Sequence, residues 1–418
     1  MAEEKRYGLI GERLGHSYSP RLHSLLGEYH YELIPLPPQA LDRFLREEPF
    51  AGLNVTIPYK QSVIPYCAEL SETARQIGSV NTLVRQGDGT LYGDNTDAYG
   101  FAEMARRARI GFGGRKTLVL GSGGTSLTAC AVIRAAGGEP VVISRQGPNT
   151  YEHMAEHRDA EVLVNTTPVG MYPATEAAPV DLQELPRVQG VLDVIYNPLR
   201  TRLLQQAEAL GLAHGGGLTM LVMQAVRACE RFTGISVPEE RVQNAISVLR
   251  REATNLVLVG MPGCGKTTVG NFLAKGTGRP LVDIDSEIER TAGCTIPEIF
   301  AQEGEAAFRK REAAQIARYG QETGRILVTG GGAVLAAANR ESLRLNGFVA
   351  HITRSLKELS MEGRPLSQSP QVLEKLWAQR EPLYAACADT TVANDKTPGA
   401  CAQAIWEAYD EAFCGERP

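Results

Sequence analysis

The chain has 418 residues, of which 43% are hydrophobic and 22% charged, with a net charge of −5. At roughly 150 residues per domain, this length predicts two to three domains that each bury a core. The slightly acidic balance gives no argument for binding to nucleic acid or to an anionic membrane surface, and we expect neither partner. No apolar run approaches the ~20 residues of a membrane span, and the eight cysteines form no C-x-x-C pair, so we expect a cytoplasmic protein.

The first hundred residues alternate short apolar runs with helical patterns, which predicts an α/β lobe. The expected strands are YGLIG, YELIPL, GLNVT, SVNTLV and TLYG, and the expected helices are SPRLHSLLGEY and FAEMARRARI. Polar clusters at 16–20, 54–60, 78–82 and 93–97 follow strand ends or strand-to-helix turns, where α/β proteins bind ligands. Together they form a pocket rich in hydroxyls and amides, with Lys60 and Asp97, that suits a small polyol acid.

A second α/β unit begins at the strand KTLVLG, and strands recur at VVIS, EVLVNT and GVLDVIY. The glycines of "LGSGGTSLTA" allow the backbone to approach a pyrophosphate at a helix N-terminus. The next strand ends in Arg145 instead of the acid that would take the ribose 2′-hydroxyl of NAD, and a guanidinium suits the 2′-phosphate of NADP. The expected NADP site consists of Gly121, Ser122, Gly123, Gly124, Thr125, Ser144 and Arg145.

Helical patterns at 218–232 and 239–250 lead to a short polar segment, 250–254, at which we expect a domain boundary. The strand NLVLVG then enters "GMPGCGKTT", a complete phosphate-binding loop in its expected context. In such a loop the backbone N–H groups cradle the phosphates, the lysine reaches the β- and γ-phosphates, and the hydroxyl binds Mg²⁺. The expected ATP site is Gly263, Cys264, Gly265, Lys266, Thr267 and Thr268.

The motifs "GHSYSPRLH", "GLNVTIPYK", "IGSVNT", "GDNTD", "DVIYNPLRT" and "GLTMLVMQA", in this order, resemble shikimate dehydrogenase over residues 6–248. The resemblance implies NADPH-dependent reduction of 3-dehydroshikimate to shikimate, with Lys60 and Asp97 as the catalytic pair. A ketone that accepts hydride needs a proton donor beside its oxygen, and an ammonium group oriented by a carboxylate serves this purpose. The resemblance further implies a carboxylate site at Ser17, Ser19 and Tyr196, and hydroxyl ligands Thr56, Asn81 and Gln224.

The motifs "VDIDSEIE", "EGEAAFRKRE", "VTGGGAVL", "GRPLS" and "QREPLYAACAD" resemble shikimate kinase over residues 255–394. The resemblance implies that Asp285 accepts the proton of the substrate hydroxyl and that Asp283 supports Mg²⁺ with Thr267. Arg364 would come from a lid to the transferring phosphoryl group. The implied shikimate ligands are Asp285, Arg309, Gly330, Gly331, Gly332 and Arg380.

The expected architecture is therefore a two-lobed dehydrogenase with a Rossmann NADP lobe, followed by a P-loop kinase domain with a parallel sheet. The expected ranges are 1–107 completed by 218–250 for the substrate lobe, 108–217 for the NADP lobe, and 254–418 for the kinase. We expect a monomer or homodimer that acts on small molecules. The two alternatives are a regulator that retains only ligand binding and a dehydrogenase fused to another small-molecule kinase. The presence of the catalytic residues argues against the first, and Arg309, Arg380 and the three glycines at 330–332 argue against the second.

Overall fold

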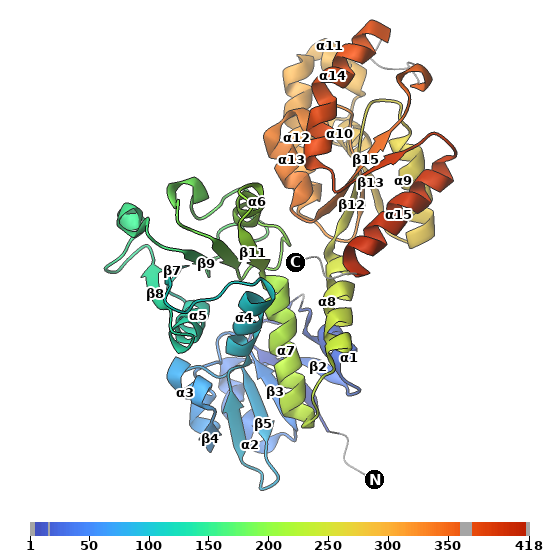
Figure 1. The fold of residues 1–418 in the computed structure, drawn as a ribbon. Helices are drawn as coiled ribbons and strands as arrows, with labels where there is room; N and C mark the ends of the chain where they lie inside the picture. The colour runs from blue at the N-terminus through green and yellow to red at the C-terminus, as the bar shows by residue number, and fades with distance from the viewer. Residues whose placement is uncertain (1–4, 16, 360–369, 415–418) are drawn as a thin grey trace. The chain divides into compact units, whose positions relative to one another are not determined.

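The computed structural model describes residues 5–15, 17–359 and 370–414 (Figure 1). Its contacts divide the chain into two compact units. Unit 1 comprises residues 1–169, 178–196 and 203–249, and unit 2 comprises residues 170–177, 197–202 and 250–418. Each unit is described by itself below.

The first sheet of unit 1 has six strands in the order β2-β1-β3-β5-β6-β4. Its strands are β1 (Tyr7–Gly11), β2 (Tyr31–Pro35), β3 (Gly52–Val55), β4 (Glu69–Leu70), β5 (Thr82–Arg85) and β6 (Leu91–Asp94). Strands β1, β2 and β3 are parallel, whereas β5 is antiparallel to both β3 and β6. The reversed strand β5 therefore begins at the edge of the sheet at which β3 and β6 end.

The second sheet of unit 1 is entirely parallel, with the order β11-β10-β9-β7-β8. Its strands are β7 (Lys116–Leu120), β8 (Glu139–Ile143), β9 (Val162–Asn165), β10 (Gly190–Asp193) and β11 (Ala213–Gly216). The interior strand β7 is buried along most of its length, as expected for a strand covered on both faces. This sheet confirms the expected Rossmann lobe.

The helices of unit 1 flank these two sheets, and α4 and α7 pack side by side (Figure 1). The α-helices are α1 (Ser19–Leu26), α2 (Leu41–Glu47), α3 (Glu72–Ile77), α4 (Thr96–Arg107), α5 (Gly124–Ala135), α6 (Arg202–Ala209), α7 (Gly217–Thr233) and α8 (Glu239–Ala253). Short 3₁₀ turns lie at Pro38–Ala40, Ile64–Tyr66, Tyr151–His157 and Leu182–Glu184. Helix α8 extends three residues beyond its expected end at Arg250, so most of the segment 250–254 is helical.

Unit 2 contains a five-stranded parallel sheet with the order β13-β14-β12-β15-β16. Its strands are β12 (Asn255–Val259), β13 (Leu281–Asp283), β14 (Ile326–Val328), β15 (Gly347–Thr353) and β16 (Thr390–Ala393). The helices are α9 (Lys266–Thr277), α10 (Ile284–Ala292), α11 (Ile296–Gln302), α12 (Gly304–Gly320), α13 (Ala337–Arg344), α14 (Pro370–Cys387) and α15 (Pro398–Cys414), with 3₁₀ turns at Ala333–Leu335 and Leu356–Glu358. Helices α9 and α15 pack together, as do α12 and α13 (Figure 1).

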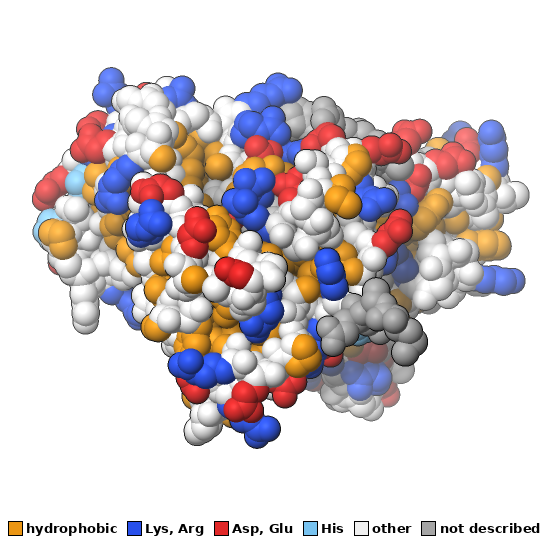
Figure 2. All heavy atoms as spheres, turned by 90° about the horizontal axis from the view of Figure 1, so that it is seen from below, with side chains coloured by type: hydrophobic (Ala, Val, Ile, Leu, Met, Phe, Trp, Pro, Cys, Tyr) orange, Lys and Arg blue, Asp and Glu red, His pale blue; other side chains and the backbone are white. Residues whose placement is uncertain are grey.

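The surface carries both signs of charge. On the face shown in Figure 2, basic and acidic side chains are interspersed, with apolar side chains in scattered groups between them. Among the described residues, no helix is both long enough and apolar enough to cross a membrane.

Candidate active sites

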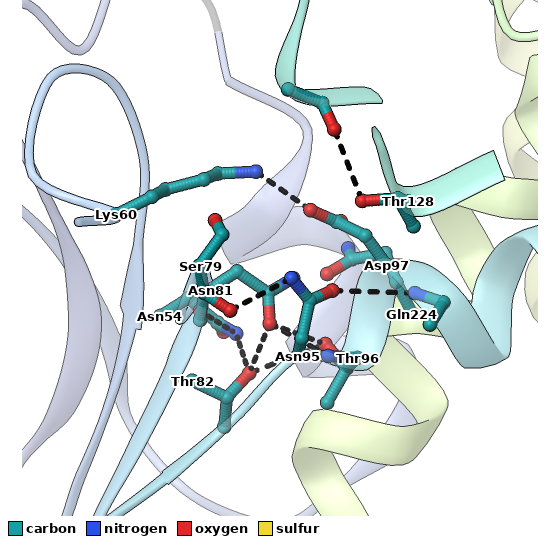
Figure 3. A network of polar contacts seen from close by, with 12 residues as sticks. Asn54, Lys60, Ser79, Asn81, Thr82, Asn95, Thr96, Asp97, Thr128 and Gln224 are labelled. Atoms are coloured by element: carbon teal, nitrogen blue, oxygen red, sulfur yellow. Dashed lines mark hydrogen bonds and ion pairs between the residues drawn. The ribbon is translucent and has the colours of Figure 1, made fainter. Parts of the chain in front are cut away.

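The first candidate site lies at the edge of the first sheet where β3 and β6 end and β5 begins. Thr82 at the start of β5 pairs with Asn54 of β3 and with Asp94 of β6, so three segments meet there. Lys60 follows β3, Asn81 precedes β5 and Asp97 follows β6. The antiparallel direction of β5 thus gathers residues from three separate motifs at one place (Figure 3).

Lys60 and Asp97 form an ion pair across this edge. Lys60 Nζ lies 2.6 Å from Asp97 Oδ2, and both side chains remain partly exposed. The Lys60 backbone is held because Val80 N donates to the Lys60 carbonyl at 2.8 Å, and the neighbouring Tyr59 and Val63 are buried. Asp97 lies in the first turn of α4, whose N-cap Asn95 also donates from Nδ2 to Ser79 O at 2.9 Å. The two groups therefore have the contact that a proton donor and its orienting carboxylate require.

The side-chain amide of Asn81 has a defined direction. Its Oδ1 accepts hydrogen bonds from Thr96 N at 2.7 Å, Thr82 Oγ1 at 3.1 Å and Thr96 Oγ1 at 3.2 Å. Because a backbone N–H can only donate, the oxygen of the amide must face Thr96. In the described part of the chain, no residue accepts from Asn81 Nδ2, so Asn81 presents a donor to a ligand (Figure 3).

The side-chain amide of Gln224 is oriented in the opposite way to that of Asn81, with its oxygen and not its nitrogen left for a ligand. Its Nε2 donates to Leu221 O at 2.9 Å, within helix α7, and this leaves Oε1 as the group that can meet a ligand. An acceptor at Gln224 and a donor at Asn81 suit a substrate with several hydroxyl groups, each of which donates and accepts.

The segment expected to hold a carboxylate lies at the start of α1. Ser19 N donates to Ser17 Oγ at 3.2 Å, and the Tyr18 ring between them meets the Tyr196 ring edge-on at 5.9 Å. Thr56, which follows β3, is held by a hydrogen bond from its N to Ile10 O at 3.0 Å. The structure thus brings the Tyr196 ring to the serine segment.

The second candidate site lies at the carboxyl end of β7. Gly121 has a φ of +104°, and a Cβ there would lie 2.9 Å from Thr166 Oγ1, so a larger residue is excluded. Gly123 and Gly124 open helix α5, and a Cβ at either position would meet no atom within 4 Å. This open space beside the N-terminus of α5 fits a pyrophosphate.

The ribose end of this site is formed by the loop after β8. Ser144 is buried, and its hydroxyl donates to Gln146 O, which closes a tight turn. Arg145 in this turn is exposed, and β8 lies next to β7 in the sheet, so Arg145 and Gly121 follow neighbouring strands. Ser122 is exposed and Thr125 is half-buried after β7. An exposed guanidinium here fits a 2′-phosphate.

The third candidate site is the phosphate-binding loop between β12 and α9. Gly260, Gly263 and Gly265 have φ values of +146°, +85° and +97°, in the region that favours glycine. Lys266 is buried, and its Nζ donates to Gly260 O at 2.9 Å and to Met261 O at 3.0 Å. Thr267 and Thr268 are exposed in the first turn of α9, whereas Cys264 is fully buried. The loop therefore has the glycines, the lysine and the free helix terminus that an ATP site needs.

Thr267 and Asp283 meet next to this loop. Thr267 Oγ1 donates to Asp283 Oδ2 at 3.0 Å, while Asp283 Oδ1 caps helix α10 by accepting from Asp285 N at 3.1 Å. A hydroxyl and a carboxylate are oxygen ligands of the kind that Mg²⁺ prefers, and Mg²⁺ commonly binds through few protein groups. These two residues fit the ion.

Two buried carboxylate oxygens converge beside the glycines after β14. A Cβ at Gly330 would lie 2.8 Å from Asp285 Oδ1 and 3.1 Å from Glu312 Oε1, and neither oxygen has a hydrogen-bond partner. Burial, together with the charges of Asp283 and Glu312, raises the pKa of Asp285 to about 6. A buried oxygen without a hydrogen-bond donor destabilises the fold unless a ligand donates to it. This position therefore fits a substrate hydroxyl.

Two arginines border the same glycines. Arg309 on α12 donates from Nη1 to Glu312 Oε2 at 2.8 Å, and a Cβ at Gly332 would lie 2.4 Å from that same nitrogen. Arg380 on α14 is 4% exposed and donates from Nη1 to Gly331 O at 3.1 Å. Both guanidinium groups thus border one small space, which suits a carboxylate. Arg364 lies outside the described residues.

Sequence reasoning missed several residues that hold the expected ones in place. Thr82 and Thr96 fix the Asn81 amide, Thr166 contacts Gly121, and Glu312 pairs with Arg309. The i, i+3 spacing of Arg309 and Glu312 on a helix was a signal that could have shown this pair. No comparable local signal marks Thr166, because its partner is distant in the sequence.

These sites define an oxidoreductase of the nicotinamide-dependent kind joined to a P-loop phosphotransferase. Residues 9–83 match the family model of the shikimate dehydrogenase substrate binding domain, and residues 217–246 match that of the shikimate 5′-dehydrogenase C-terminal domain. Residues 262–410 match the shikimate kinase family model.

Curated relatives agree with these matches. The shikimate dehydrogenase (NADP(+)) of Clostridium perfringens is 34% identical over 268 residues, which cover 59% of this chain and 98% of the relative. That of Methanopyrus kandleri is 36% identical over 278 residues, with 59% and 96% covered. The chain therefore belongs to the shikimate dehydrogenase family, and it also carries a shikimate kinase domain.

Solved structures show the same likeness. A chorismate mutase/shikimate 5-dehydrogenase fusion protein from Clostridium acetobutylicum is 34% identical with a TM-score of 0.55, and the match covers 59% of this chain and 97% of that one. The shikimate 5-dehydrogenase from Thermus thermophilus in complex with NADP(H) and shikimate is 32% identical with a TM-score of 0.52, with 58% and 98% covered.

Proposed function

We propose that the dehydrogenase part reduces 3-dehydroshikimate to shikimate with NADPH, and that the kinase part phosphorylates shikimate to shikimate 3-phosphate with ATP and Mg²⁺. One observation carries this proposal: each unit has its own glycine loop for a nucleotide and its own set of polar groups that lack protein partners. Two consecutive reactions on one metabolite are therefore assigned to one chain.

In the dehydrogenase, Lys60 donates the proton to the reduced oxygen, and Asp97 orients the ammonium group through the 2.6 Å contact. NADPH supplies the hydride. Ser17, Ser19 and Tyr196 bind the substrate carboxylate, while Thr56, Asn81 and Gln224 bind its hydroxyls. Gly121, Ser122, Gly123, Gly124 and Thr125 hold the pyrophosphate, and Ser144 and Arg145 hold the 2′-phosphate.

In the kinase, Asp285 accepts the proton of the attacking hydroxyl, because its buried Oδ1 has no protein partner. Arg309 and Arg380 pair with the substrate carboxylate, and the backbone at Gly330, Gly331 and Gly332 leaves room for the ring. Gly263, Cys264, Gly265 and Thr268 line the phosphate site, and Thr267 and Asp283 hold Mg²⁺. Lys266 and Arg364 supply positive charge to the transferring group, which is the main requirement of phosphoryl transfer.

The same proposal covers the organisation of the chain. Residues 1–107 with 218–250 form the substrate lobe, 108–217 the NADP lobe and 254–418 the kinase domain. The enzyme acts in the cytoplasm on small molecules, as a monomer or homodimer.

One experiment tests both activities together. The full chain is supplied with 3-dehydroshikimate, NADPH and ATP with Mg²⁺, and each product is followed by mass spectrometry. Lys60→Ala should slow the reduction by about 10²- to 10⁴-fold and leave phosphorylation of added shikimate unchanged, since a positioned acid or base contributes that much. Lys266→Ala should stop phosphorylation and leave the reduction unchanged. Full reduction by Lys60→Ala would remove Lys60 from the mechanism.

A further inference from the structure

The phosphate-binding loop of unit 2 has a contact that the expected ATP site does not include. Asn394 follows the edge strand β16 and is 130 residues away from the loop in the sequence. It is 5% exposed, and its Nδ2 donates to the Cys264 carbonyl at 2.8 Å. A carbonyl can only accept, so the direction of the Asn394 amide is fixed.

This contact determines how the peptide between Cys264 and Gly265 is turned. The bond is trans, because the cis bonds of the described chain all precede prolines. In a planar trans peptide the C=O and N–H bonds point in opposite directions. With the Cys264 carbonyl held toward Asn394, the Gly265 N–H must point away from it. No group in the described part of the chain accepts a hydrogen bond from this N–H.

The residue type at position 265 fits the same arrangement. Gly265 has a φ of +97°, and a Cβ there would lie 2.4 Å from Asn394 Nδ2. Any side chain at 265 would therefore push Asn394 away from the Cys264 carbonyl. The glycine at position 265 therefore permits the close contact between the loop and Asn394. The backbone of Asn394 is also held in place, because its N–H donates to Thr353 O at 2.8 Å.

We propose that Asn394 is a positioning residue for ATP: it holds the Cys264–Gly265 peptide so that the Gly265 N–H is directed at a phosphate oxygen. Backbone N–H groups bind phosphates well only when several are oriented together before the ligand arrives. Without Asn394, this peptide can rotate and turn its carbonyl oxygen toward the anion. This inference rests on the proposed function, because it presupposes that the loop binds ATP.

The test uses the full chain with Asn394→Leu, which keeps the size of the side chain and removes its hydrogen bond. Asn394→Asp is the second variant, because it keeps the shape and replaces the donor with an acceptor. The matched control is Asn255→Leu: Asn255 is also buried and donates to a carbonyl, Glu322 O, but it lies at the opposite end of β12. Affinity for ATP with Mg²⁺ is measured by calorimetry without shikimate, followed by the KM values for ATP and for shikimate.

Both Asn394 variants should bind ATP about 10- to 100-fold more weakly, since a buried acceptor left without its donor costs that much. Their KM for shikimate and their dehydrogenase rate should change less than twofold. Asn255→Leu should lower the melting temperature without weakening ATP binding. ATP affinity within twofold of the wild type in both Asn394 variants, or an equal loss in Asn255→Leu, would overturn the inference. A wild-type chain that does not bind ATP would overturn the proposed kinase function itself.

Discussion

Gly100 of α4 and Gln224 of α7 meet where these two helices cross. A Cβ at position 100 would lie 3.0 Å from the Gln224 Cβ and 2.6 Å from the Met220 carbonyl oxygen. The absence of a side chain at Gly100 therefore permits the close approach of α7. Because Asp97 lies one turn before Gly100 on α4, this packing also brings Gln224 toward the Lys60–Asp97 pair.

Gly100→Ala should therefore impair the dehydrogenase. The new methyl group must displace α7, and overpacking of this kind costs about 1–3 kcal/mol. We expect a lower melting temperature and a larger KM for 3-dehydroshikimate, since Gln224 moves with the helix. The kinase activity of the same chain is the internal control. Unchanged kinetics and an unchanged melting temperature would show that the crossing does not depend on glycine.

Asn81→Asp tests the direction of the Asn81 amide. The variant keeps an oxygen that accepts from Thr96 and Thr82, so we expect the fold to persist with a melting temperature near that of the wild type. It replaces the donor Nδ2 with a second acceptor, so the substrate loses a hydrogen-bond donor. Dehydrogenase kcat/KM should therefore fall by about 100-fold, which is equivalent to about 3 kcal/mol. Gln224→Glu adds the same charge but keeps an acceptor, and should be milder. Equal losses in both variants would indicate an effect of charge alone.

Arg145→Ala tests the preference for NADPH. The variant should raise the KM for NADPH by about 10- to 100-fold, because only that cofactor has a 2′-phosphate for a charge-assisted hydrogen bond. The KM for NADH should hardly change. Arg187→Ala is the matched control, since Arg187 is also exposed but precedes β10 and so lies at the opposite edge of the sheet. An equal loss for both cofactors would contradict the role of Arg145.

The raised pKa of Asp285 predicts how the kinase depends on pH. With a pKa of about 6, the base is protonated below that pH, so kinase kcat/KM should fall about tenfold per unit as the pH drops below 6. Asp285 belongs to the kinase, so the dehydrogenase activity need not fall over the same pH range. A kinase profile that stays flat down to pH 5 would contradict the role of Asp285 as the base.

The same shift has a consequence for stability. The folded pKa lies above the ordinary value of 3.8, so the favourable contribution of protonated Asp285 is complete below 3.8 and is lost as the pH rises through 6. Asp285→Asn should therefore stabilise the kinase unit at pH 7, by up to about 3 kcal/mol, because each pKa unit is worth about 1.4 kcal/mol. The difference in unfolding free energy between the variant and the wild type should vanish near pH 4. Denaturant unfolding at the two pH values measures it.

Local patterns in the sequence were sufficient for several parts of this protein. The loop at 260–268 follows a buried strand and opens a helix, as its glycine spacing predicts, because positive φ values and a free helix terminus are local requirements. The segments around Lys60, Asn81 and Asp97 likewise lie at strand ends, where hydrophobic periodicity stops. The helix predicted at 239–250 continues to Ala253, because polar residues can extend an amphipathic helix.

Only the tertiary structure decided which of these segments meet and in what orientation. The reversed direction of β5 places Asn81 beside Lys60 and Asp97, and Thr96 then fixes the Asn81 amide as a donor. Asn394 reaches Cys264 across 130 residues, and Glu312 and Asp285 converge on Gly330 from different helices. A sequence by itself determines residue types and local conformation. The direction of an amide or the pKa of a carboxyl depends on neighbours that only packing brings together, so these properties had to come from the fold.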